Sequence, residues 1–231
     1  MVDAERIGWF IEKNHSELTP WTPIPEGIQK LKILLSERLG RVKIKRQLFA
    51  QQKDHKLMKK MGIDKKLTEL NKELITAIEI QIKELESIIE SLINVDEEMK
   101  NQKNLIQSVP GVGKVLSWNL IAKTEGFTSI NNPRKMACYC GVVPFEYQSG
   151  TSVRRRPKVS VFADKTLKSI LHLAAISAIR LNNDLAKYYQ RKVAEGKNKM
   201  SVLNAVRNKI IHRVFAVIKN QKKYSFDLDM S

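Results

Sequence analysis

Residues 101–125, NQKNLIQSVPGVGKVLSWNLIAKTE, predict two helices joined by a tight turn. The first helix is expected to end near Ser108 and the second to begin near Lys114. The turn between them, Val109–Pro110–Gly111–Val112–Gly113, has the proline and glycine content of a chain reversal. Its glycines allow a phosphate to approach the backbone, and the free N–H groups at a helix start bind that anion.

This stretch therefore predicts a helix-hairpin-helix that grips a DNA backbone without reading the bases. Gly111, Gly113 and Lys114 are the candidate DNA-binding residues. The alternative is a plain helical turn that uses proline and glycine only to reverse the chain.

The overall charge supports a polyanionic partner. The 231 residues carry a formal net charge of +17, and only 6% of them are aromatic. Residues 1–104 hold 19 Lys/Arg and 17 Asp/Glu, whereas residues 105–231 hold 22 and 7. The excess of basic residues predicts nucleic-acid binding by the second part and a domain boundary near residue 104.

Signals for membrane insertion, secretion or a metal-binding cysteine set are not apparent in the sequence. It contains no apolar run long enough for a transmembrane helix and no recognisable signal peptide. Cys138 and Cys140 are one residue apart, which predicts two reduced, buried thiols. We therefore expect a cytoplasmic protein without a membrane partner.

Two long helices are predicted upstream of the turn. Ile28, Leu35, Val42 and Phe49 recur every seven residues, and a second apolar series runs through residues 74–95. Between the two series, Gly62 is expected to end the first helix and Asp64 to cap the second. The pattern predicts a long antiparallel helical hairpin or coiled coil.

The two arms carry opposite charge, with 11 Lys/Arg against 2 acids in residues 28–62 and 4 against 10 in residues 64–98. Mutual attraction between the arms explains this, but a basic cluster in the first arm is also a candidate RNA-binding surface. That cluster comprises Arg38, Arg41, Lys43, Lys45 and Arg46. The arms are equally a candidate dimerisation surface.

Residues 147–158, YQSGTSVRRRPK, place a Ser-Gly pair before a run of basic residues. The stretch is either an ordinary basic loop or a serine nucleophile, Ser149, held beside a polyanion with Gly150 as its partner. Its candidate DNA-binding residues are Gly150, Arg154, Arg155, Arg156 and Lys158. The predicted fold is mainly α, and it allows a short β-hairpin near residues 141–161.

The order of these parts resembles the insertion-sequence one-ten family of transposases, of the Piv/MooV or DEDD type. The resemblance is carried by LIQSVPGVGKVLSWNLIAKTEGF, ACYCGVVPFEYQSGTSVRRRPKVS and KTLKSILHLAA. It implies a bacterial or archaeal protein that recombines DNA, guided by a structured bridge RNA, and forms a dimer or tetramer through the helical hairpin.

In that family a RuvC-like domain with four acidic residues binds Mg²⁺, and a carboxyl-terminal domain supplies a serine nucleophile. Residue by residue, Ser149 matches the nucleophile, and Asp3 matches the last acid of the tetrad as a catalytic metal ligand. The resemblance implies three segments: residues 1–27 as a remnant of the RuvC-like domain and linker, 28–104 as the hairpin, and 105–231 as the transposase domain.

The other three acids would lie upstream of residue 1. We therefore expect this chain to be a truncated transposase that does not hold Mg²⁺ stably or transfer strands alone. One departure from the family is Phe162–Ala163–Asp164, where many relatives have a Lys-x-Gly-Asn turn. The alternative function is a non-catalytic helix-hairpin-helix protein that binds DNA or RNA, such as a regulator of an intact transposase.

Overall fold

The computed structural model describes residues 2–16, 23–149 and 153–225. The described chain is mainly helical, which confirms the predicted fold class. Within it, no helix is long and apolar enough to cross a membrane. The elements are α1 Val2–Asn14, α2 Glu26–Leu57, the 3₁₀ helix η1 Met58–Met61, α3 Asp64–Val95, α4 Glu97–Gln107, α5 Lys114–Thr124, α6 Pro133–Tyr139, β1 Phe145–Ser149, β2 Val153–Lys158, α7 Lys165–Ala178, α8 Asp184–Ala194 and α9 Lys199–Asn220.

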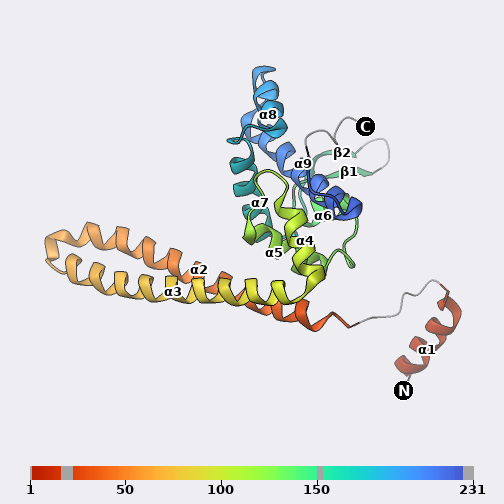
Figure 1. The fold of residues 1–231 in the computed structure, drawn as a ribbon, viewed down its shortest axis with the longest axis horizontal. Helices are drawn as coiled ribbons and strands as arrows, with labels where there is room; N and C mark the ends of the chain where they lie inside the picture. Colours follow the sequence, from red (N-terminus) through yellow and green to blue (C-terminus); the bar gives the residue numbers. More distant parts are fainter. Residues whose placement is uncertain (1, 17–22, 150–152, 226–231) are drawn as a thin grey trace.

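The predicted helical hairpin is formed by α2 and α3, which lie side by side and project away from the other helices (Figure 1). Gly62 ends η1 in the left-handed conformation with φ +74°, as glycine readily does. The predicted cap by Asp64 is wrong. Ile63 occupies the N-cap and Asp64 is the first helical residue, so the start of α3 has no side-chain cap.

The hairpin is anchored at its base. Ile28 and Leu31 of α2 are buried with Ile89 and Ile93 of α3 in the main hydrophobic core. The predicted domain boundary at residue 104 falls inside α4, which follows α3 directly. Whether residues 28–104 form a separate domain stays a prediction.

The remaining helices pack around one core that α4, α5, α7 and α9 share. Ile106, Trp118, Leu171 and Ile210, one from each of these helices, are almost completely buried. Burying apolar surface of this kind is the main favourable contribution to folding. Because the base of α2 and α3 joins the same core, the orientation of the hairpin relative to α5 and α7 is fixed by packing.

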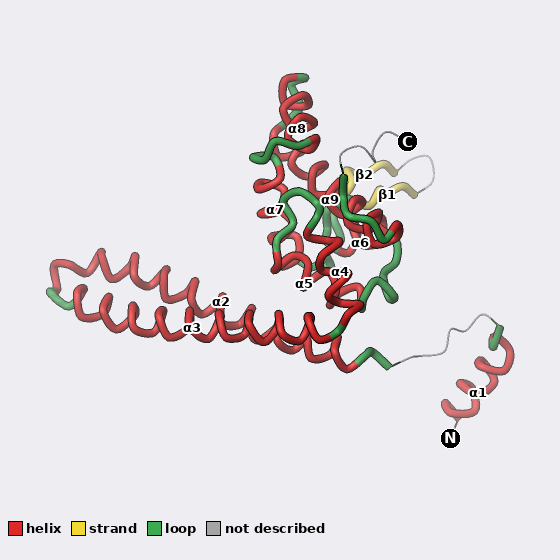
Figure 2. Tube along the Cα trace, in the orientation of Figure 1, coloured by secondary structure: helices red, strands yellow, loops and turns green. Residues whose placement is uncertain are grey.

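The strand elements form one antiparallel pair, β1 and β2, shown in yellow in Figure 2. Ser149 pairs with Val153 and Tyr147 with Arg155, and the register is irregular between Phe145 and Tyr147. The short β-hairpin allowed by the sequence is therefore present. Gly150 lies outside the described residues.

Candidate nucleic-acid interface

The predicted turn between two helices lies where the sequence places it, between α4 and α5. Gly111 has φ +83°, and a Cβ added there would clash with the carbonyl oxygen of Ala174 and lie 2.7 Å from Cβ of Ala178. Glycine is thus required at this position because the turn packs directly on α7. A contact between Gly111 and a phosphate stays a prediction.

Gly113, unlike the tightly packed Gly111, lies in open space. It is exposed, and no atom lies within 4 Å of the position where its Cβ would be. It is the N-cap of α5 and has an extended backbone, with no side chain capping the free N–H groups of the first turn. An uncapped helix start that faces open space offers an anion several N–H donors and the positive end of the helix dipole.

Lys114 follows this helix start and is largely exposed, but it has a partner. Its Nζ lies 3.2 Å from Oε1 of Glu90 on α3. The other carboxylate oxygen of Glu90 is 2.7 Å from Nζ of Lys103, which is buried. Burial raises the pKa of Glu90, but the hydrogen bond from Lys103 and the nearby charge of Lys114 outweigh it, so the net pKa is lowered and the carboxylate stays charged.

The basic cluster on α2 divides into paired and unpaired residues. Arg38 binds Glu86 and Lys45 binds Glu79, each at 2.6 Å and each across the two arms. Arg41 binds Glu37 at 2.6 Å within α2. Three of the five residues of this cluster, Arg38, Arg41 and Lys45, therefore already have acidic partners in the hairpin. For Arg38 and Lys45, mutual attraction between the arms explains the pairing.

Lys43 and Arg46 are different. Both are exposed, and within the described part of the chain neither has a hydrogen bond or ion pair to another side chain. Both line a groove of about 680 Å³ that also contains Gly113 and Lys114. The structure thus brings the predicted RNA-binding cluster and the predicted DNA-binding turn together on the two walls of one groove.

The groove runs between α2 on one side and the starts of α5 and α7 on the other. Its lining has five basic side chains and one carboxylate: Arg38, Lys43, Arg46, Lys114, Lys165 and Glu86. Thr166 and Ser169 add hydroxyl groups from α7. A concave surface with this excess of positive charge attracts phosphate backbones.

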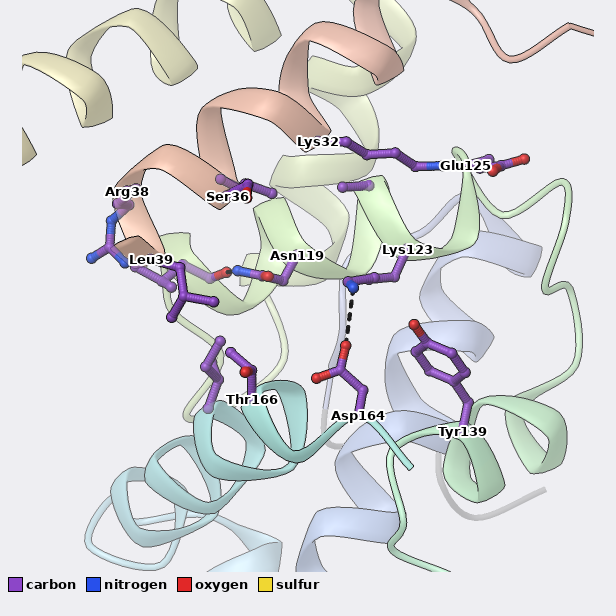
Figure 3. Close-up of a pocket in the computed structure, with 14 residues that line it drawn as sticks. Lys32, Ser36, Arg38, Leu39, Asn119, Lys123, Glu125, Tyr139, Asp164 and Thr166 are labelled. Carbon is purple, nitrogen blue, oxygen red and sulfur yellow. Dashed lines mark hydrogen bonds and ion pairs between the residues drawn. The ribbon is translucent and has the colours of Figure 1, made fainter. Parts of the chain in front are cut away.

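A second hollow, of about 500 Å³, continues the groove towards α6 and is shown in Figure 3. The two share Arg38, Leu39, Val115, Thr166 and Ile170. Charges in this hollow are paired: Lys32 binds Glu125 at 2.6 Å, and Lys123 binds Asp164 at 3.0 Å. Among the described residues, the free positive charge therefore lies in the groove that Lys43 and Arg46 line rather than in this hollow.

Asp164 also organises the start of α7. Its carboxylate accepts a hydrogen bond of 2.8 Å from the backbone N–H of Leu167, as an N-cap does. Burial raises the pKa of Asp164, but the bonds from the Leu167 N–H and from Lys123 outweigh it, so the pKa is lowered. The ion pair correspondingly raises the pKa of Lys123 against the opposing effect of burial.

Sequence reasoning missed the contribution of α7 to this site, which consists of Lys165, Thr166 and Ser169. The available signal was a capping Asp followed by Lys and Thr, a pattern that places a cation and a hydroxyl at a helix start. It could not show that this start faces the turn before α5, because about 50 residues separate them.

The predicted nucleophile and the basic residues that follow it lie on the β-hairpin, whose side chains are outside the described part of the chain. Ser149 is the last residue of β1, and Arg154, Arg155, Arg156 and Lys158 lie along β2. The backbone description places the serine and the basic residues on adjacent strands, with Ser149 opposite Val153 and Gln148 opposite Arg154. Their roles in catalysis and DNA binding stay predictions.

Asp3 lies in the first turn of α1, a helix that buries none of its residues. In residues 2–16, 23–149 and 153–225, no group of three or more His, Cys, Asp or Glu side chains could hold a metal ion. Asp3 alone does not fit the four-acid site that the resemblance implies for Mg²⁺.

Comparison with known proteins gives one family match and several similar proteins. Residues 103–190, which include the turn before α5, the β-hairpin and α7, match the Transposase IS116/IS110/IS902 family. The chain is 26% identical to the pilin gene-inverting protein of Moraxella bovis over 144 residues, covering 62% of this chain and 45% of that protein.

Two insertion-element proteins are also similar. A 43.6 kDa protein of the element IS110 from Streptomyces coelicolor is 26% identical over 152 residues, covering 65% of this chain and 36% of that protein. A 42 kDa protein of IS900 from Mycobacterium paratuberculosis is 24% identical over 135 residues, covering 56% and 33%. The matched regions span less than half the length of these relatives.

Proposed function

We propose that this chain is a DNA-recombining protein of the IS110 transposase family, and that it holds nucleic acid in the groove between α2, α5 and α7. The observation that carries the proposal is the meeting of two independently predicted surfaces in one groove: the open start of α5 and the unpaired basic residues of α2. The family match over residues 103–190 supports it, because that segment supplies the whole α5–α7 wall.

The charged groups of the groove suit a phosphate backbone. Gly113 and Lys114 offer N–H donors and a cation, and Lys43 and Arg46 face them with two more cations. Contacts of this kind position a strand and carry no sequence information. A bridge RNA of the kind that the resemblance implies would then supply the sequence choice, with DNA or RNA held by the same phosphate contacts.

We further propose Ser149 as the nucleophile of the recombination reaction. Its Oγ would form a bond to a DNA phosphorus while the bond from that phosphorus to one bridging deoxyribose oxygen breaks. The serine proton leaves to a base, and the released deoxyribose oxygen takes up a proton, so the exchange of esters needs no oxidant or reductant. Support comes from the family match, which includes Ser149, and from the basic strand β2 paired with β1.

The first test is binding of fluorescently labelled DNA and RNA, followed by anisotropy over a range of salt concentrations. The double variant Lys43→Gln, Arg46→Gln should bind about tenfold or more weakly at about 0.15 M salt, with a shallower dependence of log K on log salt concentration. Lys65→Gln, Lys66→Gln is the matched control, since it removes the same charge near the tip of the hairpin. If both double variants bind nucleic acid equally well, the groove is not the binding surface.

Formation of a covalent protein–DNA adduct, rather than binding, separates the two candidate functions. A non-catalytic regulator needs the groove but not Ser149, whereas a recombinase needs both. We also propose that the chain self-associates through the helical hairpin. Sedimentation of the free chain and of the nucleic-acid complex tests this.

A further inference from the structure

The turn between β2 and α7 presents two apolar side chains to solvent. Phe162 is 92% exposed and Val161 is 83% exposed, although phenylalanine is normally among the more buried residues. Single exposed apolar residues are common, but two adjacent ones at a turn next to a basic strand are a candidate contact site.

This turn is held firmly at its base. The backbone N–H of Phe162 donates to Oγ of Ser160 at 3.2 Å, and that of Asp164 donates to the carbonyl oxygen of Tyr139 at 2.9 Å. Gly141 packs beneath it so closely that an added Cβ would lie 2.8 Å from side-chain atoms of both Val159 and Ala163. Phe162 therefore projects from a fixed backbone, which lowers the entropy cost of using it in binding.

The charge around the turn indicates what it contacts. Residues 153–168 contain six Lys/Arg and one acid, Asp164, whose carboxylate is already paired with Lys123. A second copy of this chain, itself at +17, would bring like charge to the contact. Nucleic acid brings the complementary charge together with flat aromatic bases.

The turn also adjoins the groove. Asp164 lines the hollow shown in Figure 3, and Phe162 precedes it by two residues, which span at most about 7 Å. A strand that continues from the groove into this hollow would come within reach of the exposed ring of Phe162.

We propose that Phe162 stacks on an unpaired base of the nucleic acid held in the groove. This rests on the proposed nucleic-acid binding and adds a base contact to it. Stacking on an aromatic ring is tolerant of sequence because every base has a flat face, so Phe162 would hold a base out of its helix without selecting which one.

The test uses single-stranded DNA and RNA of one sequence that carry the fluorescent base 2-aminopurine, together with the matching duplexes. Phe162→Ala should lower affinity for the single strands about tenfold and lose the quenching of 2-aminopurine. Its salt dependence should stay unchanged, because no phosphate contact is lost. Phe162→Trp should retain binding and quenching, whereas Phe162→Leu should lose the quenching.

Val161→Ala is the control at the same turn and should leave quenching intact. The thermal stability of the Phe162 variants should match that of the parent chain, because the side chain is exposed. The proposal is overturned if Phe162→Ala binds and quenches as the parent does, or if it changes the sedimentation mass but not the affinity. If the parent chain itself binds no nucleic acid, the proposed function fails as well, and the two failures are thus distinguishable. A larger effect on the DNA or the RNA strand identifies which of them supplies the base.

Discussion

Lys114 Nζ lies 3.2 Å from Oε1 of Glu90, so the cation beside the open start of α5 is already paired with a carboxylate of the hairpin. A phosphate that binds at Gly113 and Lys114 must therefore compete with Glu90. Because the side chain of Lys114 is 67% exposed, it can turn towards an incoming phosphate with little loss of packing.

Replacing Glu90 should strengthen nucleic-acid binding and weaken folding. Glu90→Gln removes the competing charge, and we expect affinity to rise about threefold or more, consistent with the small energies of exposed ion pairs. The same change leaves the buried Lys103 without its carboxylate, so the free energy of unfolding should fall by about 1–3 kcal/mol. Anisotropy and urea unfolding measure the two effects. Glu84→Gln, an exposed glutamate on the same helix, is the control. A fall in affinity for Glu90→Gln alone would contradict the competition.

The two glycines of the turn should respond in opposite ways to alanine. Gly111→Ala forces a Cβ into the backbone of α7 at a positive φ, and we expect a loss of about 2 kcal/mol or more of unfolding free energy. Gly113→Ala meets open space, so its stability should change by less than about 1 kcal/mol. Thermal or urea unfolding distinguishes the packing role of Gly111 from a phosphate-binding role, in which Gly113 would be the more sensitive residue in binding assays.

Arg38 and Arg46 both lie on α2, but Arg38 should contribute to stability and Arg46 to nucleic-acid binding. Arg38→Gln breaks the 2.6 Å pair with Glu86, so unfolding free energy should fall by about 0.5–1 kcal/mol. A double-mutant cycle with Glu86→Gln should return a coupling of that size. Arg46→Gln should leave stability unchanged and weaken nucleic-acid binding instead. These separate roles are contradicted if Arg46→Gln lowers the free energy of unfolding as much as Arg38→Gln does.

Much of the fold could be predicted from the sequence because its signals are local. The heptads of residues 28–49 and 74–95, the stop at Gly62 and the turn at residues 109–113 each depend on a few neighbouring residues, and each gives the observed element. The mistaken cap at Asp64 shows the limit of such signals. A helix that begins one residue earlier moves the N-cap from Asp64 to Ile63.

The groove could not be predicted in the same way, because its walls come from residues far apart in the sequence. Arg46 and Lys165 line one groove only because the base of α2 joins the core of α5 and α7, and no local pattern records that packing. Nor does the sequence show which cations are neutralised. Arg38 and Lys45 are paired because the register of α3 places Glu86 and Glu79 opposite them.

A partly buried polar cluster links α7, α9 and the loop before β1, and it should make stability depend on pH. Arg207 Nη2 lies 2.7 Å from Nδ1 of His172, Nη1 donates to Asn204, and Asn204 donates to the carbonyl oxygen of Val142 at 2.8 Å. Burial, and then the charge of Arg207, lower the pKa of His172. Neutral His172 can accept the hydrogen bond from the guanidinium, whereas the protonated ring cannot.

The direction of this pH dependence follows from the difference in proton binding between the unfolded and the folded chain. Below the ordinary pKa of about 6.5, the unfolded chain binds a proton at His172 that the folded chain resists, so folding stability falls as pH falls through that range. His172→Gln should flatten this dependence between about pH 7 and pH 5, and His212→Gln, on α9, should not. Urea unfolding over that range measures it. A parent chain whose stability is the same at both ends, or a His172→Gln variant with an undiminished dependence, would contradict the role given to the cluster.

Ser149 is the residue whose replacement should separate binding from chemistry. With a RuvC-like domain of the family supplied, together with Mg²⁺ and labelled DNA, the chain should form a protein–DNA adduct that survives denaturing electrophoresis, because an ester between serine and phosphate is covalent. Ser149→Ala should lose the adduct and keep its affinity for DNA, while Ser152→Ala, a neighbouring hydroxyl, should keep both. An adduct that persists in Ser149→Ala would assign the nucleophile to another residue. Binding by the groove without any adduct would favour the non-catalytic alternative.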